Sequence, residues 1–476
     1  MRETSPATPD TIGRTDFVLE QLRGGAVTAV DVCRSAEISQ ASFSRSIQDL
    51  RSRFGESLLS LARVGGQRAP LYALARDVPR CESVIPVHRV DESGRVSSAG
   101  FTAMLVPRGC ATLRDGVGRL FDGLPPELHH AAPAGFMGRR LATATHAELG
   151  LPPHLRDWSD DHLLTFLCNR SSNAPGNLVF GNESLTRLLR ERAQPVMTAA
   201  ARQVDFPRLA MAAAAEDANS AQVGGEQPKF TAAMEDIGHV LVKHARSDTR
   251  MADLLHMEHL ALRTLGDHGI AAAATHRHEF GGMTFLEIER FDRVGRTGRL
   301  GMISAGAYDD EHFGSRDNWA DFARRLVKAE VLDEAAVMPI LVQQAFSQLT
   351  GNTDTHFENL SLMLDAHGEV SSVAPAYDIL PMCYAPGSAS GMDPELKVIQ
   401  PSVGRIGANP AVWEIAARAA LAFWDAASTD TAISPPMREV AKLNRAQVAA
   451  FVEPLLPPPA TEAPEPPAPS RRRARP

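Results

Sequence analysis

Three oxygen-bearing side chains stand close together after one apolar segment of the chain. Asp354 and Asn359 are five residues apart in a loop that follows the expected helix 338–349, and Asp378 follows one expected hairpin later. Phosphoryl transfer uses such a set, because one carboxylate accepts a hydroxyl proton while a carboxamide and a second carboxylate hold Mg²⁺ against a triphosphate. We therefore expect the three side chains to converge. Taken singly, each of them is equally typical of a turn or a strand end.

A cation that could face this set is Lys243, at the end of the apolar strand 239–244. The chain has five lysines among its 49 basic residues, so Arg serves as the cation almost everywhere. Because Arg does not replace the compact ammonium of Lys, a lysine in this chain is informative. Its ammonium either reaches solvent or meets an anion, and a nucleotide phosphate is the anion we expect. On the expected helix 251–265, Glu258 is a candidate to orient the lysine.

A glycine-containing segment precedes the strand by about 14 residues and reads GGEQPKF over 224–230. Gly224 and Gly225 would let backbone amides approach a phosphate, with Gln227 and Lys229 beside them. The segment is no Walker A loop, because Lys229 is followed by Phe230 instead of Ser or Thr. A Gly-Gly pair alone is more often a turn.

A second strand, 284–288, runs into the charged segment 289–293 and predicts a hinge between two lobes. Backbone groups of Glu289 and Phe291 would bond an adenine, and Asp292 would reach a ribose hydroxyl. The alternative is an ordinary strand end with surface ion pairs.

The N-terminal region, 12–80, predicts a winged helix-turn-helix. Helices are expected over 16–22, 29–35 and 40–53, with Thr28 and Ser39 as N-caps, followed by a hairpin around Gly65-Gly66. One face of the last helix and the tip of the hairpin carry the side chains expected to contact DNA, which are Gln40, Ser42, Ser44, Arg45, Gln48 and Arg68. The alternative is a small helical oligomerisation cap.

Length and composition indicate how many domains carry these sites. The 476 residues, with 44% hydrophobic and 22% charged side chains, predict several globular domains. We expect boundaries at 12–80, 83–215 and 216–455, with a disordered Pro- and Arg-rich tail at 456–476. The net charge of -8 excludes global affinity for nucleic acid. No apolar run is long enough for a membrane span or a signal peptide, and the five cysteines form no C-x-x-C pair, so a cytoplasmic protein is expected.

These segments together resemble the HipA family of serine/threonine kinases, the toxins of bacterial toxin–antitoxin pairs. The resemblance rests on GGEQPKF (224–230), HVLVK (239–243), EIERFDR (287–293), GNTDTHFENLSLM (351–363) and AYDILP (376–381). Weaker matches are GLPPEL (123–128) and PGNLVFG (175–181). The fused N-terminal region is most similar to the YjjJ-type (HipH) branch of the family.

The resemblance implies an α+β, bilobed, protein-kinase-like domain that uses ATP and Mg²⁺. It implies that Lys243 contacts the ATP phosphates, that Asp354 is the catalytic base and that Asn359 and Asp378 bind Mg²⁺. The nucleotide site that it implies comprises Gly224, Gly225, Gln227, Lys229, Lys243, Glu289, Phe291, Asp292, His356 and Tyr377. Its implied partners are a protein phosphoacceptor, in known cases an aminoacyl-tRNA synthetase, and an antitoxin.

Two departures leave alternatives open. The regulatory serine of the family is replaced by Gln222, and Ser220 lies out of register. The DNA-binding region is fused to the same chain. An active protein kinase is therefore weighed against a transcription regulator whose kinase-like domain only senses nucleotide, and against a kinase that acts on a small molecule.

Overall fold

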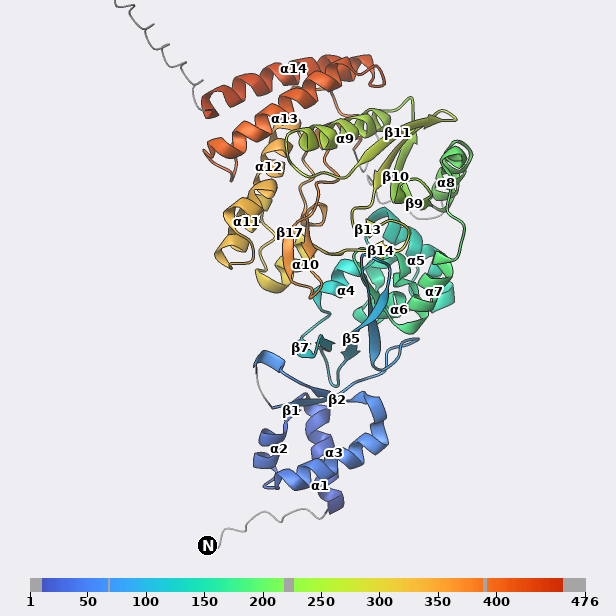
Figure 1. Cartoon of the computed structure of the whole chain (residues 1–476), viewed down its shortest axis with the longest axis vertical. Coiled ribbons are helices and arrows are strands. Elements are labelled where there is room, and N and C mark those ends of the chain that lie inside the picture. Colours follow the sequence, from blue (N-terminus) through green and yellow to red (C-terminus); the bar gives the residue numbers. More distant parts are fainter. Residues whose placement is uncertain (1–10, 67–68, 218–226, 388–391, 457–476) are drawn as a thin grey trace, which may run out of the picture.

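The computed structural model describes residues 11–66, 69–217, 227–387 and 392–456. Figure 1 shows an elongated molecule, with the first helices of the chain at one end and the last two at the other. Arg68, Gln222, Gly224, Gly225 and the tail from 457 onward lie outside the described residues.

The N-terminal part contains three helices and a small antiparallel sheet of strand order β1-β3-β2. Both expected N-caps are present, since the hydroxyls of Thr28 and Ser39 accept hydrogen bonds from the N–H groups of Asp31 and Ser42. Apolar side chains from all of these helices and from the sheet share one core. The elements are α1 (Thr11–Gly24), β1 (Val27–Thr28), α2 (Ala29–Ser35), α3 (Gln40–Phe54), β2 (Leu58–Leu61) and β3 (Leu71–Leu74).

The middle part is built on a five-stranded antiparallel sheet of order β7-β6-β5-β4-β8. The elements are β4 (Ile85–Val90), β5 (Val96–Met104), β6 (Cys110–Arg114), β7 (Val117–Phe121), α4 (Pro126–Ala131), α5 (Gly135–Leu149), α6 (Asp160–Arg170), β8 (Leu178–Phe180), α7 (Asn182–Arg192) and α8 (Arg202–Asp217).

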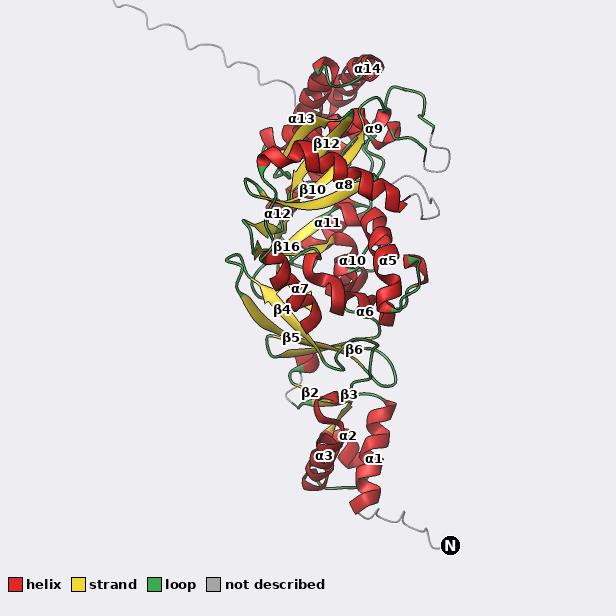
Figure 2. Cartoon of the chain, turned by 90° about the vertical axis from the view of Figure 1, so that its right-hand side faces the viewer, coloured by secondary structure: helices red, strands yellow, loops and turns green. Residues whose placement is uncertain are grey.

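Backbone hydrogen bonds join the N-terminal sheet to the middle sheet, which lie next to each other in Figure 2. The N–H of Val106 donates to the carbonyl of Leu74 at 2.9 Å, and the N–H of Gly118 donates to the carbonyl of Ala62 at 2.9 Å. A small apolar cluster from β2, β3, β5 and β6 fills the space between them. The N-terminal part is thus fastened to its neighbour by more than a linker.

A four-stranded antiparallel sheet of order β11-β12-β10-β9 follows. Helix α8 packs on one face of this sheet and α9 packs near the other. The edge strand β9 begins at Lys229, within the glycine-containing segment 224–230. The elements are β9 (Lys229–Met234), β10 (Gly238–Arg246), α9 (Arg250–Asp267), β11 (Thr275–Phe280), β12 (Met283–Glu289) and the short pair β13 (Arg293–Val294) and β14 (Gly298–Arg299).

The C-terminal part is mostly helical and holds the largest apolar core, between α9, α12, α13 and α14. It also contains a three-stranded sheet of order β15-β16-β17. The elements are β15 (Gly301–Ser304), α10 (Ala305–His312), α11 (Trp319–Lys328), α12 (Glu334–Thr350), β16 (Ser361–Leu364), β17 (Val370–Val373), α13 (Pro410–Thr429) and α14 (Pro435–Val452).

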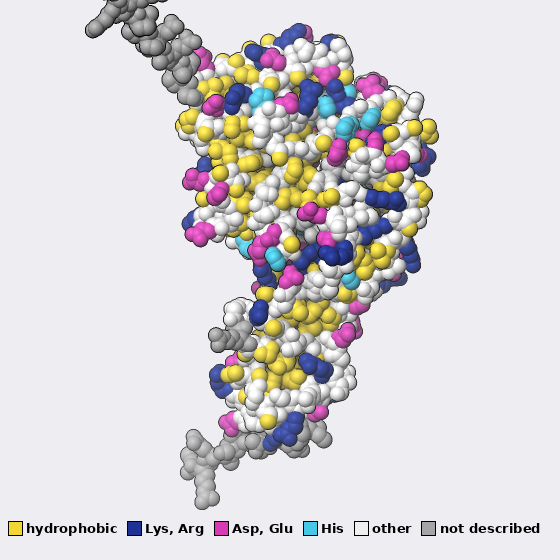
Figure 3. All heavy atoms as spheres, viewed as in Figure 1, with side chains coloured by type: hydrophobic (Ala, Val, Ile, Leu, Met, Phe, Trp, Pro, Cys, Tyr) yellow, Lys and Arg dark blue, Asp and Glu magenta, His cyan; other side chains and the backbone are white. Residues whose placement is uncertain are grey.

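Helices and antiparallel sheets thus alternate in separate layers, and the α+β class expected from the sequence is confirmed. Within the ranges described, no helix is both long and apolar enough to cross a membrane. Acidic and basic side chains are interspersed over the face drawn in Figure 3.

Candidate active site

Lys243 lies at the centre of the candidate site, on the inner strand β10. Its side chain is buried, with 3% of the residue exposed. The ammonium donates to both carboxylate oxygens of Glu258 on α9, each at 2.8 Å, and to Oδ1 of Asp378. The orienting role expected for Glu258 therefore has its contact in the structure.

The pKa values of this cluster follow from burial and charge. Burial alone would lower the pKa of Lys243, but the carboxylates of Asp378 and Glu258 outweigh it and raise the pKa. Burial opposes ionisation of Asp378, yet the charges of Lys243 and Lys229 lower its pKa to about 2. Burial raises the pKa of Glu258. One ammonium between two carboxylates leaves the cluster with excess negative charge, which a further cation would neutralise.

Lys229 is the second cation of the cluster. It lies directly opposite Lys243 across the β9–β10 pair, so both side chains project from the same face of the sheet. Gln227, just before β9, donates its side-chain amide to the carbonyl of His244 at 3.2 Å. It thereby ties the start of β9 to the lysine strand.

Asp378 sits in a backbone conformation that non-glycine residues rarely adopt, with φ of 55°. Two backbone hydrogen bonds hold the segment before it: the N–H of Ala376 donates to Ala271, and the N–H of Ala273 donates to Ala376. These bonds fasten Asp378 to the region between α9 and β11. A strained, well-supported carboxylate of this kind is typical of functional sites.

The loop after α12 carries the other expected residues. Gly351 ends the helix with φ of 72°. Asn352 accepts the N–H of Asp354 at 3.1 Å, and the amide of Asn359 donates to the carbonyl of Asp354 at 3.1 Å. These bonds fold the loop so that Asn359 is buried while the Asp354 side chain stays 44% exposed. An exposed carboxylate on a fixed loop can reach an incoming substrate.

His356 links this loop to Asp378. Its Nε2 lies 3.7 Å from Asp354 and its Nδ1 lies 3.3 Å from Glu358. The contact with Glu358 raises the pKa of His356, and the charges of Asp354 and Asp378 contribute in the same direction. The loop and Asp378 are therefore close enough to interact electrostatically.

Tyr377 and Phe291 form an aromatic pair between the hinge and the segment that carries Asp378. Their ring centroids are 5.6 Å apart. The Tyr377 hydroxyl donates to the carbonyl of Glu358 at 2.7 Å and bonds the hydroxyl of Ser361 at 2.8 Å. Two rings beside a buried lysine offer an apolar surface for a planar base.

The position of Asp292 corrects the expectation of a ribose contact. The residue is 4% exposed. Its oxygens accept from Arg290 at 3.0 and 2.8 Å, from Arg293 at 2.6 Å and from the N–H of Gly176 at 2.9 Å. Burial is outweighed by the two guanidinium groups, which lower the pKa of Asp292. With its oxygens engaged this way, Asp292 fastens the hinge to the middle part of the chain.

Glu289 ends β12, and its carboxylate accepts from Nε2 of His276 at 2.9 Å. Its backbone N–H donates to Ala274 and the next N–H donates to the carbonyl of His239. The hinge backbone is thus held between two strands, and the Glu289 side chain points along the sheet toward β11.

The residues expected to contact DNA lie on α3. Gln40, Ser44, Arg45 and Gln48 are exposed, whereas Ser42 is half-buried with its hydroxyl 3.1 Å from that of Ser39. Phe43, Ile47 and Leu50 are buried on the opposite face. The helix therefore presents a mostly polar surface, in which Ala41 is an exposed apolar side chain.

The structure thus brings Lys229, Lys243, Glu258 and Asp378 together and sets the Asp354 loop beside them. No group of three or more His, Cys, Asp or Glu side chains that could hold a metal occurs within the described ranges. Asn359 and Asp378 offer one carboxamide and one carboxylate, which fits Mg²⁺ bound largely through phosphates and water. Sequence reasoning missed the cross-strand pairing of the two lysines, because only the register of β9 reveals it.

Comparisons with known proteins identify the family of this chain. Residues 81–189 match the family described as the YjjJ-like toxin, middle domain, and residues 221–450 match the HipA-like C-terminal domain. The chain is 32% identical over 442 residues to the toxin YjjJ of Escherichia coli (strain K12), covering 90% of this chain and 95% of that protein.

Two solved structures are more distantly similar. A chain of the HipA, HipB and operator DNA complex from Shewanella oneidensis MR-1 has a TM-score of 0.44 and 12% identity, covering 78% of this chain and 97% of that one. The Helicobacter pylori proinflammatory kinase CtkA has a TM-score of 0.34 and 11% identity, covering 47% and 92%. Such distant similarities carry no weight here, and the assignment rests on the full-length relative and the two family matches. On that basis the chain belongs to the HipA/YjjJ-type toxin family.

Proposed function

We propose that this protein is an ATP-dependent serine/threonine protein kinase that uses Mg²⁺. The observation that carries the proposal is the buried Lys243, held by Glu258 and in contact with Asp378 beside the Asp354 loop. A lysine fixed by a helix carboxylate and a separate magnesium-binding carboxylate are the parts that protein kinases must bring together.

In this proposal each side chain has a distinct task. Asp354, exposed at the mouth of the site, accepts the proton of the attacking hydroxyl. The ammonium of Lys243 contacts the ATP phosphates, and Lys229 lies beside it on the same sheet face. Asn359 and Asp378 hold Mg²⁺, which when bound neutralises charge on the phosphates. The γ-phosphoryl group passes to the hydroxyl oxygen and ADP leaves.

The nucleotide base is proposed to bind between β10 and the aromatic pair. Phe291 and Tyr377 supply the apolar surface, and backbone groups of Glu289 and Phe291 supply hydrogen bonds. His356 lies on the phosphate side, together with Gln227 just before β9 and Lys229 at its first position. Gly224 and Gly225, which lie outside the described residues, are proposed to contact the phosphates as well. We leave Asp292 out of these contacts because its oxygens are engaged elsewhere.

The proposed phosphoacceptor is a serine or threonine of a translation-related protein, with the aminoacyl-tRNA synthetases as first candidates. We further propose that the N-terminal part is a winged helix-turn-helix that binds DNA through α3. The polar exposed face of α3 supports this, since a recognition helix presents such side chains to base edges. An antitoxin is a proposed partner, as expected for a member of a toxin family.

A transcription regulator with a non-catalytic, nucleotide-sensing domain is the alternative. The polar face of α3 supports the regulator and the enzyme equally. An exposed Asp354 at a fixed position, however, has no role in sensing nucleotide, and this favours the enzyme. Asp354→Ala and Arg45→Ala together separate the two. A regulator should keep its function with Asp354→Ala and lose it with Arg45→Ala, whereas an enzyme should lose phosphoryl transfer with Asp354→Ala and keep it with Arg45→Ala. Exposed Arg95→Ala in the middle part is the matched control.

The proposal is tested by incubating the full-length protein with a cell lysate and ATP labelled on the γ-phosphate. We expect labelled protein bands with the wild type and none above background with Asp354→Asn. The matched control, Asp267→Asn at the exposed end of α9, should label as the wild type does. Equal labelling by wild type and Asp354→Asn, or none by either while ATP binds, would reject the enzyme.

A further inference from the structure

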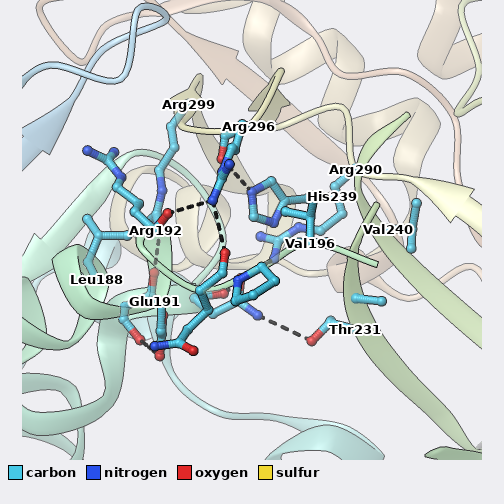
Figure 4. A pocket seen from close by; sticks show the side chains of 16 residues that line it. Leu188, Glu191, Arg192, Val196, Thr231, His239, Val240, Arg290, Arg296 and Arg299 are labelled. Carbon is cyan, nitrogen blue, oxygen red and sulfur yellow. Dashed lines mark hydrogen bonds between the residues drawn. The ribbon is translucent and has the colours of Figure 1, made fainter. Parts of the chain in front are cut away.

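A cavity of about 350 Å³ lies between the middle part and the four-stranded sheet, away from the candidate active site. Its walls come from α7 and the segment after it, from the start of β10 with the neighbouring part of β9, and from the β13–β14 turn. Figure 4 shows Arg296 reaching across the cavity wall beside His239. The volume lies within the range of small-molecule sites.

Positive charge dominates this cavity. Four arginines line it, Arg192, Arg290, Arg296 and Arg299, against one carboxylate, that of Glu191. Three of them, Arg192, Arg296 and Arg299, form no ion pair in the part of the chain that the structure describes. Arg192 is half-buried and Arg299 is buried, and such guanidinium groups without a counter-ion are costly unless an anion joins them, whereas Arg296 is exposed.

Arg299 is the deepest of the four, with 5% of the residue exposed. Its Nη2 donates to the carbonyl of Ser172, while its Nη1 has no partner among the described residues. Burial, together with the charge of Arg290, lowers the pKa of Arg299 to about 10. A buried donor without a partner is uncommon in folded proteins, so Arg299 adds an uncompensated charge to the wall of the cavity.

Within the described part of the chain, Arg192 and Arg296 bond only backbone oxygens. Arg192 donates to the carbonyls of Gly94 at 2.8 Å and Thr297 at 2.9 Å, and its Nε has no partner among these residues. Arg296 donates through one nitrogen to the carbonyls of Arg192 and Gln194, both at 2.9 Å. Both guanidinium groups are therefore held in place while their charges stay uncompensated. Preorganised charge of this kind suits binding of an anion.

The fourth arginine, Arg290, differs from the other three because it has a carboxylate partner. Arg290 is neutralised by Asp292 and also donates to the side chain of Asn173 at 2.7 Å. It therefore serves as a wall of the cavity and as part of the hinge. The remaining walls include apolar side chains, among them Leu188 and Val196. A ligand with a compact uncharged body and one strongly anionic group matches this lining.

The cavity is separate from the proposed nucleotide site. None of Lys243, Asp354, Asn359, Tyr377 or Asp378 lines it. Two segments link them: Arg290 of the cavity wall lies between Glu289 and Phe291 of the hinge, and on β10 His239 lines the cavity four residues before Lys243, a separation of about 13 Å along a strand.

We propose that this cavity is a second ligand site, which binds a phosphate monoester of about mononucleotide size through Arg192, Arg296 and Arg299. A phosphate group accepts several charge-assisted hydrogen bonds at once, and guanidinium groups match its geometry. Because the walls come from the middle part and from the sheet, the bound ligand bridges the two and stabilises their contact.

The test is direct binding to the full-length protein by calorimetry, with inorganic phosphate, ribose 5-phosphate and GMP as separate probes. Ribose and guanosine are the matched probes without phosphate. The variants are Arg296→Ala, an exposed side chain whose loss should not unfold the protein, and Arg299→Gln. Arg418→Ala, exposed on α13, is the control. Asp378→Asn reports on binding in the nucleotide site instead.

We expect at least one phosphorylated probe to bind at least tenfold more tightly than its unphosphorylated counterpart. Its affinity should fall about tenfold or more in Arg296→Ala and Arg299→Gln, equivalent to about 1.4 kcal/mol, and stay unchanged in Arg418→Ala and Asp378→Asn. Binding of phosphate alone would identify a free-ion site, and binding only of the larger probes would identify a monoester site. The proposal is overturned if no probe binds below about 10 mM, if Arg296→Ala binds as the wild type does, or if only Asp378→Asn loses binding. Since no probe is ATP and no turnover is measured, failure here leaves the kinase proposal standing.

Discussion

Two clusters of charge lie next to the same strand, β10, and they are balanced in opposite ways. At Lys243 one ammonium meets two carboxylates within the protein. At the arginine cavity, three guanidinium groups meet none among the described residues. The first cluster is stable without a ligand and can accept a further cation, whereas the second is incomplete without an anion. The comparison teaches that counting partners separates charges that support the fold from charges that await a ligand.

The largest loss of stability is expected from a substitution in the lysine cluster. Lys243→Met removes the ammonium that contacts both Glu258 and Asp378, so the buried carboxylate of Glu258 and the partly exposed carboxylate of Asp378 lose this partner. We expect the free energy of unfolding to fall by about 3–5 kcal/mol. Urea unfolding followed by circular dichroism measures the change. Lys328→Met, exposed at the end of α11, should stay within about 0.5 kcal/mol of the wild type. A loss as small as that of the control would mean that the buried contacts do not support the fold.

Asp354→Asn should strongly lower the rate of phosphoryl transfer and leave the free energy of unfolding unchanged. The side chain is 44% exposed and lies outside the buried lysine cluster. We expect phosphoryl transfer to fall by about 10²–10⁴-fold, the usual contribution of a general base. Single-turnover transfer to a trapped phosphoacceptor gives the rate, and thermal unfolding gives the stability. A large loss of stability would show that the residue holds the loop instead of acting on substrate.

The contribution of Asp378 to stability should depend on pH in the acid range. Its pKa in the folded protein is about 2, below its ordinary value of 3.8, so the contribution of its carboxylate to stability is fully present above about pH 4. It is lost as the pH falls from about 4 toward 2. The difference in unfolding free energy between wild type and Asp378→Asn should therefore shrink over this range. A difference that stays constant from pH 5 to 3 would contradict the ion pair with Lys243.

Arg299 should give the smallest effect when no ligand is present. Arg299→Leu removes a charge that burial disfavours, but it also removes the hydrogen bond to the Ser172 carbonyl. We expect these to offset each other within about 1 kcal/mol in phosphate-free buffer. Urea unfolding in that buffer provides the number. A loss of unfolding free energy as large as that of Lys243→Met would mean that the charge of Arg299 stabilises the fold in the absence of a ligand.

Much of the site could be predicted from the sequence because its parts are local. Lys243 follows from a lysine on an apolar strand, and the bonds of Asp354 and Asn359 lie within a few residues of each other. The caps at Thr28 and Ser39 were also predictable, since N-caps depend on neighbouring residues.

Contacts between distant segments could not be predicted in this way. Asp292 bonds Gly176, which lies 116 residues earlier, so its position at a hinge suggested a ribose contact instead. The pairing of Lys229 with Lys243 depends on the register of an edge strand that read as a loop. Likewise, the arginines of the cavity come from separate segments, and nothing in their spacing joins them. Local pattern gives the elements, and tertiary packing decides which charges meet.

The central claim is that the Lys243 cluster and the Asp354 loop transfer phosphate to protein hydroxyls. Mass spectrometry of phosphosites, after expression of the wild type or of Asp354→Asn in the same cells, tests it most directly. The account predicts serine or threonine phosphosites on one or a few proteins that occur with the wild type and disappear with the variant. Identical phosphosites from both proteins, at matched expression, would contradict it.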